Sequence, residues 1–497
     1  MNKRTALSQR LVILWWVCVA AAFGAVTLMY FVLFWKLSFV DMPGNECDSD
    51  TCPRGMGWLF LFTPATGLLT VLAWAFVKDA KEEPRRSCLV RLVAVVVALA
   101  ALWPGWRAYE WMRGPQMYVS GWQMADGSGA AKPLGVWAPP DQGGGLLVRA
   151  RVDGLVAFDG EGRHGWRLPA PDRAPLCALG RATSAGIGLV VHEEGARGCG
   201  ARVTAVELTE GRRLWTRETA GQPVAAVGGT AVLAQPDAVL GLDLREGGEL
   251  WRLPVAADCR VGAVDGAGSG GRHGAGAGAG AAGAGAVGPV VYVEECGGGA
   301  RSRVVAVDAR TGARAWETAL PTASPLSELR VLSATPLAVR VKESVPLGTD
   351  AVLLFDAGGA IRGQVPAAAL EGEPLVTDGL LVSAVKTGKK SGVAAYSLTD
   401  GRRAWQRGLG EERVLGLAPA EQPGEVAVVS TDHWWTYLTR LGRDDGGRRE
   451  EATVLREMPL GSRFTFRPGP PGAYVFVNLD ADDELFPTFE VLPVWGW

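Results

Sequence analysis

Apolar residues are distributed in two different ways along this chain. Residues 11–35, 56–77 and 89–106 are almost unbroken apolar runs, each long enough to span a hydrocarbon layer of about 30 Å as a helix. After residue 140 the apolar stretches are short and alternating, and turns rich in Gly, Asp and Thr separate them. Such alternation is typical of β-strands. The pattern therefore predicts three transmembrane helices followed by an all-β domain.

One short phrase recurs in the β-rich part of the chain. A strand-like stretch leads to an acidic residue or Ser, then to a turn that contains Gly, and then to a Trp four positions after that Gly. The five copies are Val156–Trp166, Ala205–Trp215, Gly241–Trp251, Ala306–Trp316 and Ala395–Trp405. A sixth copy, Phe355–Gly363, keeps the Asp and the Gly turn but has no Trp. Self-similarity at roughly forty residues indicates a β-propeller with one copy in each blade.

The Trp of each copy falls on the outer strand of its predicted blade. An indole at that place can fill the gap between neighbouring blades and bury roughly 150–250 Å². A catalytic residue would occur once, whereas a residue that packs blades together recurs with the blade. We therefore expect a structural role for the five tryptophans, which are Trp166, Trp215, Trp251, Trp316 and Trp405.

The phrase A-x-D-x-x-T-G-x-x-x-W, best matched by Ala306–Trp316, resembles the repeat of quinoprotein-like (PQQ-repeat) β-propellers. That family includes the pyrroloquinoline-quinone alcohol dehydrogenases and the outer-membrane assembly lipoprotein. The resemblance covers residues 141–410 well and 411–490 loosely, and it implies a propeller of seven or eight blades. Eight blades are favoured, because eight is usual in the family and the strand-rich tail can complete an eighth blade with a strand from before residue 145.

The expected organisation follows from these patterns. Residues 1–110 form a membrane anchor with helices at about 11–35, 56–77 and 89–106. Residues 111–140 are a linker or the first propeller strand, and residues 141–497 form the propeller.

Charge predicts the orientation of the anchor. Lys and Arg gather before the first helix and in the 78–91 segment, whereas the segment between the first and second helices is mainly acidic. The positive-inside rule then places the N-terminus in the cytoplasm and the propeller outside the cytoplasmic membrane, with lipid around the helices.

Cysteine positions agree with an extracytoplasmic propeller. Of eight cysteines, Cys18 and Cys88 fall in or beside the helices, and the other six fall in segments predicted to be external. We expect three disulfides, because external compartments are oxidising and no C-x-x-C pair or His cluster supports zinc. The predicted pairs are Cys177–Cys199, Cys259–Cys296 and, as the least certain pair, Cys47–Cys52.

A Gly- and Ala-rich stretch over residues 262–288 predicts a flexible insertion in the propeller. Because it lies between Cys259 and Cys296, the bridge between these two is expected to close its base.

Motifs for catalysis or nucleic-acid binding are missing from the sequence. A quinoprotein dehydrogenase needs a metal held by acidic and amide ligands, but the chain has only three asparagines, and no adjacent-cysteine pair occurs. His192-Glu193-Glu194 lacks the second His of a zinc protease motif, and Lys386–Ser391 lacks the first Gly of a phosphate loop. The net charge of −2 gives no basic surface for nucleic acid.

The sequence therefore predicts a membrane-anchored, extracytoplasmic β-propeller that acts as a non-catalytic binding or scaffold module of the cell envelope. No catalytic, cofactor-binding or metal residue is assigned, and no cofactor is expected. The expected partner is an envelope protein of unknown identity. The alternative is a membrane-bound quinoprotein oxidoreductase.

Overall fold

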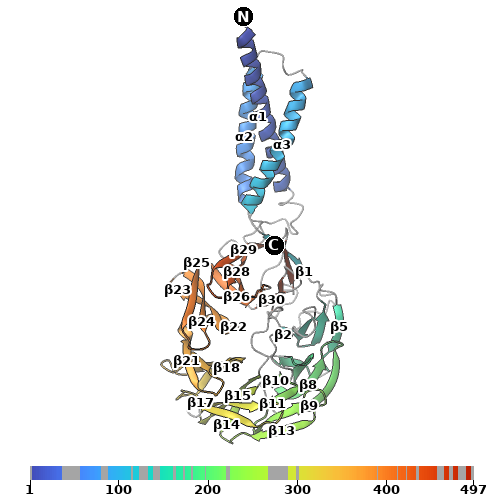
Figure 1. The fold of residues 1–497 in the computed structure, drawn as a ribbon. Coiled ribbons are helices and arrows are strands. Elements are labelled where there is room, and N and C mark those ends of the chain that lie inside the picture. The colour runs from blue at the N-terminus through green and yellow to red at the C-terminus, as the bar shows by residue number, and fades with distance from the viewer. Residues whose placement is uncertain are drawn as a thin grey trace.

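The computed structural model describes most of the chain, in twenty segments. These are residues 3–35, 56–79, 88–113, 116–121, 133–137, 146–159, 164–171, 174–180, 183–195, 198–219, 224–266, 289–297, 302–388, 390–410, 412–420, 422–431, 436–455, 464–468, 474–478 and 489–493. A bundle of helices extends from one edge of a ring of β-sheets (Figure 1).

Three helices form the N-terminal bundle: α1 (Lys3–Trp35), α2 (Met56–Asp79) and α3 (Cys88–Arg113). Each contains a stretch that is long and apolar enough to cross a membrane, namely Leu11–Trp35, Trp58–Lys78 and Val90–Tyr109. Helix α1 packs against both other helices. The Thr27 and Thr66 hydroxyls are 2.9 Å apart between α1 and α2, and the Tyr30 hydroxyl donates to the Gly105 carbonyl of α3 at 3.2 Å. The predicted apolar runs are thus confirmed as helices.

The strands form seven sheets, of which six have four strands each. The first sheet contains β2 (Pro133–Trp137), β3 (Leu147–Arg151), β4 (Gly154–Phe158) and β5 (His164–Pro169). The second contains β6 (Leu176–Leu179), β7 (Ile187–Glu193), β8 (Cys199–Glu207) and β9 (Arg212–Glu218). The third contains β10 (Val224–Val227), β11 (Thr230–Ala234), β12 (Ala238–Asp243) and β13 (Glu249–Pro254).

The next three sheets repeat the same antiparallel order. The fourth contains β14 (Cys259–Gly266), β15 (Pro289–Cys296), β16 (Arg303–Asp308) and β17 (Arg314–Ala319). The fifth contains β18 (Leu326–Ala334), β19 (Leu337–Glu343), β20 (Asp350–Phe355) and β21 (Ile361–Pro366), and the short 3-10 helix η6 (Ala367–Ala369) follows it. The sixth contains β22 (Glu371–Thr377), β23 (Leu380–Thr387), β24 (Lys390–Ser397) and β25 (Arg403–Gly410).

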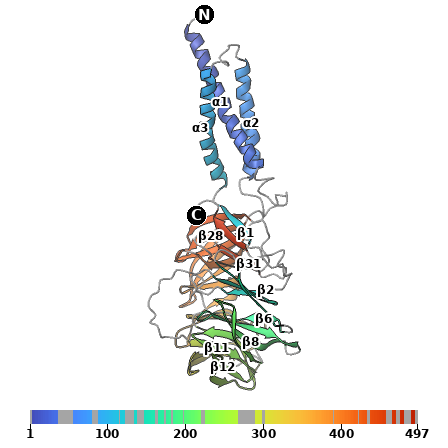
Figure 2. The same cartoon turned by 90° about the vertical axis from the view of Figure 1, so that its right-hand side faces the viewer.

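The seventh sheet has eight strands, in the order β26-β27-β28-β29-β1-β32-β31-β30. Its strands are β26 (Arg413–Pro419), β27 (Glu425–Thr431), β28 (Thr436–Gly442), β29 (Arg448–Leu455), β1 (Gln116–Gly121), β32 (Phe489–Pro493), β31 (Tyr474–Asn478) and β30 (Phe464–Pro468). Strand β1, which follows α3, pairs antiparallel with β32 and parallel with β29. This sheet closes the ring beside the helices (Figures 1 and 2).

The blade count depends on how this last sheet is divided. Seven separate sheets fit a count of seven, whereas the sequence favoured eight. The strands of the tail do combine with a strand from before residue 145, as predicted. Strand β30 also contacts β26 in the same way as β26 contacts β22 and β18 contacts β14. The two four-stranded units nevertheless merge into one sheet because β1 pairs with both β29 and β32.

The core of the propeller lies between neighbouring blades. Small and β-branched residues fill it, and Val290 and Val305, for example, are completely buried against the preceding blade. Ala, Val and Leu on flat, pleated faces allow adjacent sheets to approach closely, which suits the alternating pattern read from the sequence.

The expected insertion differs from the structure at its start. Gly262 to Gly266 belong to β14, where Val264 pairs with Tyr292, so a regular strand continues into the range expected to be flexible. Residues 267–288 lie outside the described residues.

Candidate functional site

The predicted tryptophans share one environment in four blades. Trp251, for example, lies across from Gly241 of its own sheet, and its ring covers Gly312 in the turn of the next blade. Its indole nitrogen donates to the Ala309 carbonyl at 2.9 Å. The same bond joins Trp166 to Leu208 and Trp215 to Leu244, each at 2.9 Å, and Trp405 to Arg443. In all four, the acceptor stands three residues before the covered glycine.

The turn glycines are required for this contact. Gly312 has a φ of 70°, and a Cβ added to it would lie 2.7 Å from the Trp251 ring. A side chain there would both strain the left-handed backbone and displace the indole. The repeat therefore encodes a reciprocal contact, in which the Trp of one blade needs the Gly of the next.

The acidic residue of the repeat shapes the same turn. The Asp308 carboxylate accepts hydrogen bonds from the backbone N–H groups of Arg310 and Thr311, at 3.1 and 2.8 Å. Hydrogen bonds from Thr311 are the main reason why the pKa of Asp308 lies below its usual value. The Asp is therefore a turn-forming residue, and it presents its carboxylate to the backbone rather than to a substrate.

The sixth repeat departs from this pattern in two ways. Its Trp position is Gly363, which pairs with Leu354, whereas the corresponding pair in the fourth sheet is Trp316 with Ala306. A Cβ on Gly363 would meet the Asp400 backbone at 2.4 Å, so the next blade's turn takes the place of an indole. Its turn is also shorter: Asp356 N–H donates to Ala360, four residues ahead, whereas Asp308 N–H donates to Ala313, five residues ahead.

The shorter turn changes the environment of Trp316. This indole still covers the next turn glycine, Gly359. Among the described residues, however, no acceptor is found for its indole N–H, and the Gly359 carbonyl accepts a hydrogen bond from the Thr318 hydroxyl at 2.6 Å. The ring is only half-buried and stacks on Phe355, with ring centres 6.4 Å apart and planes 13° from parallel.

A largely apolar cleft of about 690 Å³ lies beside this pair. Trp316 and Phe355 line it, together with Leu337, the first residue of β19, and Leu398 from the turn between β24 and β25. Asp356 and Arg362 supply an ion pair at 2.5 Å on its wall. The volume and the mixture of aromatic, aliphatic and a few polar groups fall within the range typical of ligand-binding sites.

A second cleft, of about 500 Å³, lies where β14 and β18 begin and β11 and β15 end, the opposite ends of strands from those at the first cleft. Its principal charges neutralise each other, because Arg260 pairs with Glu295 at 2.6 Å. Glu295 also accepts the Leu326 N–H at 3.2 Å. The first cleft is the stronger candidate, because its lining is mainly apolar and includes two aromatic residues, whereas no aromatic residue lines the second.

The two longer cysteine pairs lie at disulfide distance. The sulfur–sulfur separations are 1.95 Å for Cys177–Cys199 and 1.98 Å for Cys259–Cys296. Cys177 is on the first strand of its sheet and Cys199 begins the third, as the alignment of repeats predicts. Cys47 and Cys52 lie outside the described residues.

The Cys259–Cys296 bridge does not close the base of the Gly/Ala insertion, as the sequence suggested. Cys259 begins β14 and Cys296 ends β15, so they face each other at the open end of this hairpin. Gly266 and Val290 pair at the other end, next to residues 267–288. The predicted position of the bridge relative to the insertion was wrong because β14 continues past Gly262.

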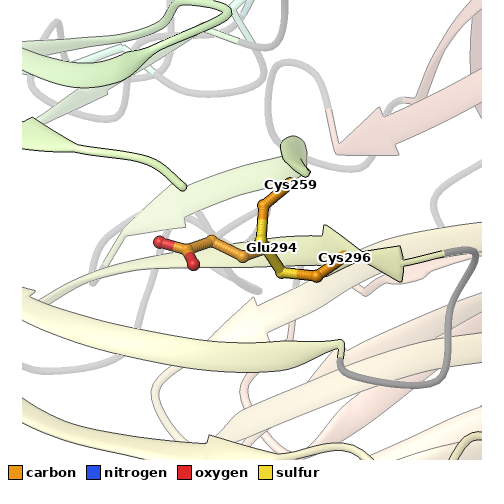
Figure 3. A group of neighbouring side chains, drawn as sticks. All are labelled: Cys259, Glu294 and Cys296. Atoms are coloured by element: carbon orange, nitrogen blue, oxygen red, sulfur yellow. A yellow bond between two sulfur atoms is a disulfide. The ribbon is translucent and has the colours of Figure 1, made fainter. Parts of the chain in front are cut away.

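Glu294 lies beside this bridge (Figure 3), and the three side chains have the spacing of a metal site. The two sulfurs are joined to each other, so they are not thiolate ligands in this state. The buried Glu294 carboxylate pairs with Arg303 at 2.7 Å. This cluster is therefore a disulfide beside a buried ion pair.

His192 and Lys386, from two of the remaining sequence motifs, make contacts within the propeller sheets. His192 is buried, with Nδ1 3.0 Å from the Ala174 carbonyl and Nε2 2.9 Å from the Thr204 hydroxyl. Burial lowers the pKa of His192. Lys386 pairs with Ser391 where β23 and β24 are joined antiparallel. His433-Trp434-Trp435, the most conspicuous polar-aromatic cluster of the sequence, lies outside the described residues.

Sequence reasoning missed the cleft and the special position of Trp316. One signal was available, because Gly359 follows Asp356 by three residues, whereas Gly312 follows Asp308 by four. The loss of an acceptor through a shorter turn, however, depends on the packing of two blades.

Comparison with known proteins gives a family. Residues 106–269 and 300–467 match the PQQ_2 family, described as outer membrane protein assembly factor BamB. No curated protein matches the chain.

Three solved structures have a similar backbone arrangement. One is the C-terminal WD40 domain of Sif2, with 9% identity, covering 77% of this chain and 100% of that one, and a TM-score of 0.46. Another is the eukaryotic initiation factor, with 11% identity, coverages of 65% and 88%, and a TM-score of 0.40. The third is the Myceliophteria thermophila Cps50 (Swd1) β-propeller domain, with 13% identity, coverages of 74% and 98%, and a TM-score of 0.38.

Proposed function

Because the chain belongs to the PQQ_2 repeat family, we propose that it is a membrane-anchored binding or scaffold module of the cell envelope. The propeller lies outside the cytoplasmic membrane and binds a protein partner, and the chain is not an enzyme. The observation that carries the proposal is the joining of a repeat-built propeller to three helices long enough to cross a membrane.

The division into an anchor over residues 1–110, a linker or first propeller strand over 111–140 and a propeller over 141–497 is part of the proposal, and β1 and β2 of the middle range supply strands to two propeller sheets. Strand β1, between the two, pairs with the last strand of the chain, so the propeller is tied to the anchor where its ring closes. Such an arrangement holds a binding surface next to a membrane without requiring catalytic groups in the propeller.

The proposed orientation rests on charge and on the course of the helices. Helix α1 begins and α2 ends at the same end of the bundle, away from the propeller (Figure 1). The basic residues Lys3, Arg4 and Arg10 precede the first span, and Lys78 ends the second. Positive residues are retained on the cytoplasmic side, which supports an external propeller.

Protease protection tests the orientation. Protease added to intact spheroplasts should digest the region after residue 110, while a cytoplasmic marker protein stays intact. If that region is protected until the spheroplasts are lysed, the orientation is reversed.

Cofactor addition tests the absence of quinoprotein activity. The purified full chain, given pyrroloquinoline quinone and calcium, should show neither bound-quinone absorbance nor dye-linked oxidation of alcohols or sugars. A stoichiometric spectrum together with turnover would establish the alternative oxidoreductase.

Crosslinking in intact envelopes tests partner binding. A photoreactive residue placed on exposed propeller turns should give discrete adducts with an envelope protein, and the same residue on the lipid-facing side of α2 serves as the control. Adducts from α2 positions alone would contradict a propeller-borne partner site.

A further inference from the structure

We propose that the cleft beside Trp316 binds an aromatic side chain carried by an extended segment of a partner protein. The proposal rests on the protein-binding function above and deepens it, because it names the site and the chemistry of the partner. It follows from the way in which the sixth repeat departs from the others.

The other blade junctions show which group this kind of surface accepts. At four junctions an indole covers a turn glycine and donates to a backbone carbonyl, as Trp251 does to Ala309. These tryptophans use both the apolar face and the N–H of the ring. Trp316 uses its face on Gly359 and Phe355, but no described acceptor receives its N–H.

The cause is the length of the turn between β20 and β21. With three residues between its hydrogen-bonded ends instead of four, this turn does not bring a carbonyl to the Trp316 nitrogen. The same shortening leaves the cleft between the Trp316–Phe355 pair and the Leu398 turn. An indole N–H without a described protein acceptor and a largely apolar cleft therefore occur together beside the shortened turn.

The lining specifies an aromatic group followed by a backbone acceptor. Aromatic rings gain from stacking beyond their buried area, so the exposed part of the half-buried Trp316 ring favours another ring. A peptide carbonyl next to that ring can accept the Trp316 N–H, and the Asp356–Arg362 pair on the wall offers further polar contacts. A peptide provides ring and carbonyl on one short segment, which favours a protein partner.

The test uses the full chain in lipid nanodiscs and the peptide Ac-Gly-Trp-Gly-NH2 as the probe. The chain is labelled with 5-fluorotryptophan, and the resonance of position 316 is identified by its loss in Trp316→Phe. The probe should shift this resonance in a saturable way. Ac-Gly-Ala-Gly-NH2 should not shift it, and empty nanodiscs measure partition of the probe into lipid.

Two variants distinguish a loss of binding in the cleft from a general loss of stability. Ala357 is an exposed residue that lines the cleft, so Ala357→Trp should fill it and weaken binding of the probe about tenfold or more. Ala313→Trp is the matched control, since Ala313 is exposed on the preceding turn outside the cleft, and it should bind like the parent.

A turn graft tests the cause directly. Replacing Ala357-Gly358 by Ala-Arg-Thr, the residues of the preceding blade's turn, restores the usual length. The graft should return an acceptor to Trp316, raise the melting temperature and abolish the probe-induced shift.

The proposal is overturned if the folded parent shows no saturable shift, if the alanine peptide shifts the resonance equally, or if Ala357→Trp and the graft bind like the parent. Failure here is distinguishable from failure of the proposed function. Crosslinks from other propeller turns to an envelope protein would persist in the Ala357→Trp variant if only the cleft assignment is wrong.

Discussion

Replacing Trp251 by Ala should destabilise the propeller strongly. Trp251 is only 7% exposed, and it is held between Gly241 of its own sheet and Gly312 of the next blade. A buried Trp removes roughly 150–250 Å² from water. At about 25 cal/mol per Å² this burial contributes on the order of 4–6 kcal/mol, and large-to-Ala changes in cores cost about 3–5 kcal/mol. We therefore expect a loss of about 4 kcal/mol.

The hydrogen bond can be separated from the burial. Trp251→Phe keeps an aromatic ring but leaves the Ala309 carbonyl without its indole donor. A lost hydrogen bond of this kind costs about 1 kcal/mol, so Phe should be clearly milder than Ala. Trp316→Ala is a second comparison, and its cost should fall below that of Trp251→Ala because Trp316 is half-buried and has no described acceptor.

The measurement is thermal and urea-induced unfolding of the full chain, followed by circular dichroism of the β-sheet signal. Trp251→Ala should lower the urea midpoint without a large change in slope. The reasoning is refuted if Trp251→Ala unfolds at the parent's midpoint, or if Trp316→Ala is the more damaging of the two.

Three further outcomes are expected. Non-reducing peptide mapping should recover Cys177 joined to Cys199 and Cys259 joined to Cys296; a Cys177–Cys259 peptide, or labelling of all four without reductant, would contradict both pairs. Gly312→Val should lower the melting temperature by straining a φ of 70° and striking the Trp251 ring, whereas the exposed Ala313→Val should not. The pKa of His192 is lowered by burial, so the unfolded chain takes up a proton near pH 6.5 that the folded chain does not; stability should therefore fall as pH drops below about 6.5, and His192→Gln should flatten this dependence in melts between pH 7.5 and 5.5.

The repeat made most of the fold predictable. Strand order, the turn glycines and the pairing of cysteines follow from aligning copies of one phrase, because every blade solves the same packing problem. The alignment of Ala306–Trp316 with Gly241–Trp251 already places Trp316 and Trp251 at one position. Their similar registers with Ala306 and Gly241 follow from it.

Features that depend on long-range pairing were less accessible. The merging of the last two units into one sheet requires β1 to pair with β29 and β32, which are far apart in sequence. The continuation of β14 to Gly266 was missed because Gly and Ala are poor strand formers. Pairing with β15, in which Tyr292 and Val293 are buried, outweighs that local preference.

Glu343 is another residue that no local pattern indicates. Its carboxylate accepts the N–H groups of Ala323 and Ser324 at 2.7 and 2.6 Å, and also that of Thr349 at 2.5 Å. These bonds, chiefly the one from Thr349, hold the pKa of Glu343 below its usual value. The residue joins two connections that are distant in sequence, so its role becomes visible only in the folded chain.

The distinction between structural and functional residues in a repeat protein follows from these observations. A residue that keeps the same contacts in every copy stabilises the fold, and Trp251 with its glycine and carbonyl is such a residue. A copy that loses one contact and gains a cleft has given up stabilisation at that place, which natural sequences do mainly at functional sites. Trp316 keeps the glycine contact, lacks a described acceptor and lines the cleft. The irregular turn after Phe355, rather than the recurring phrase, is therefore where binding should be sought.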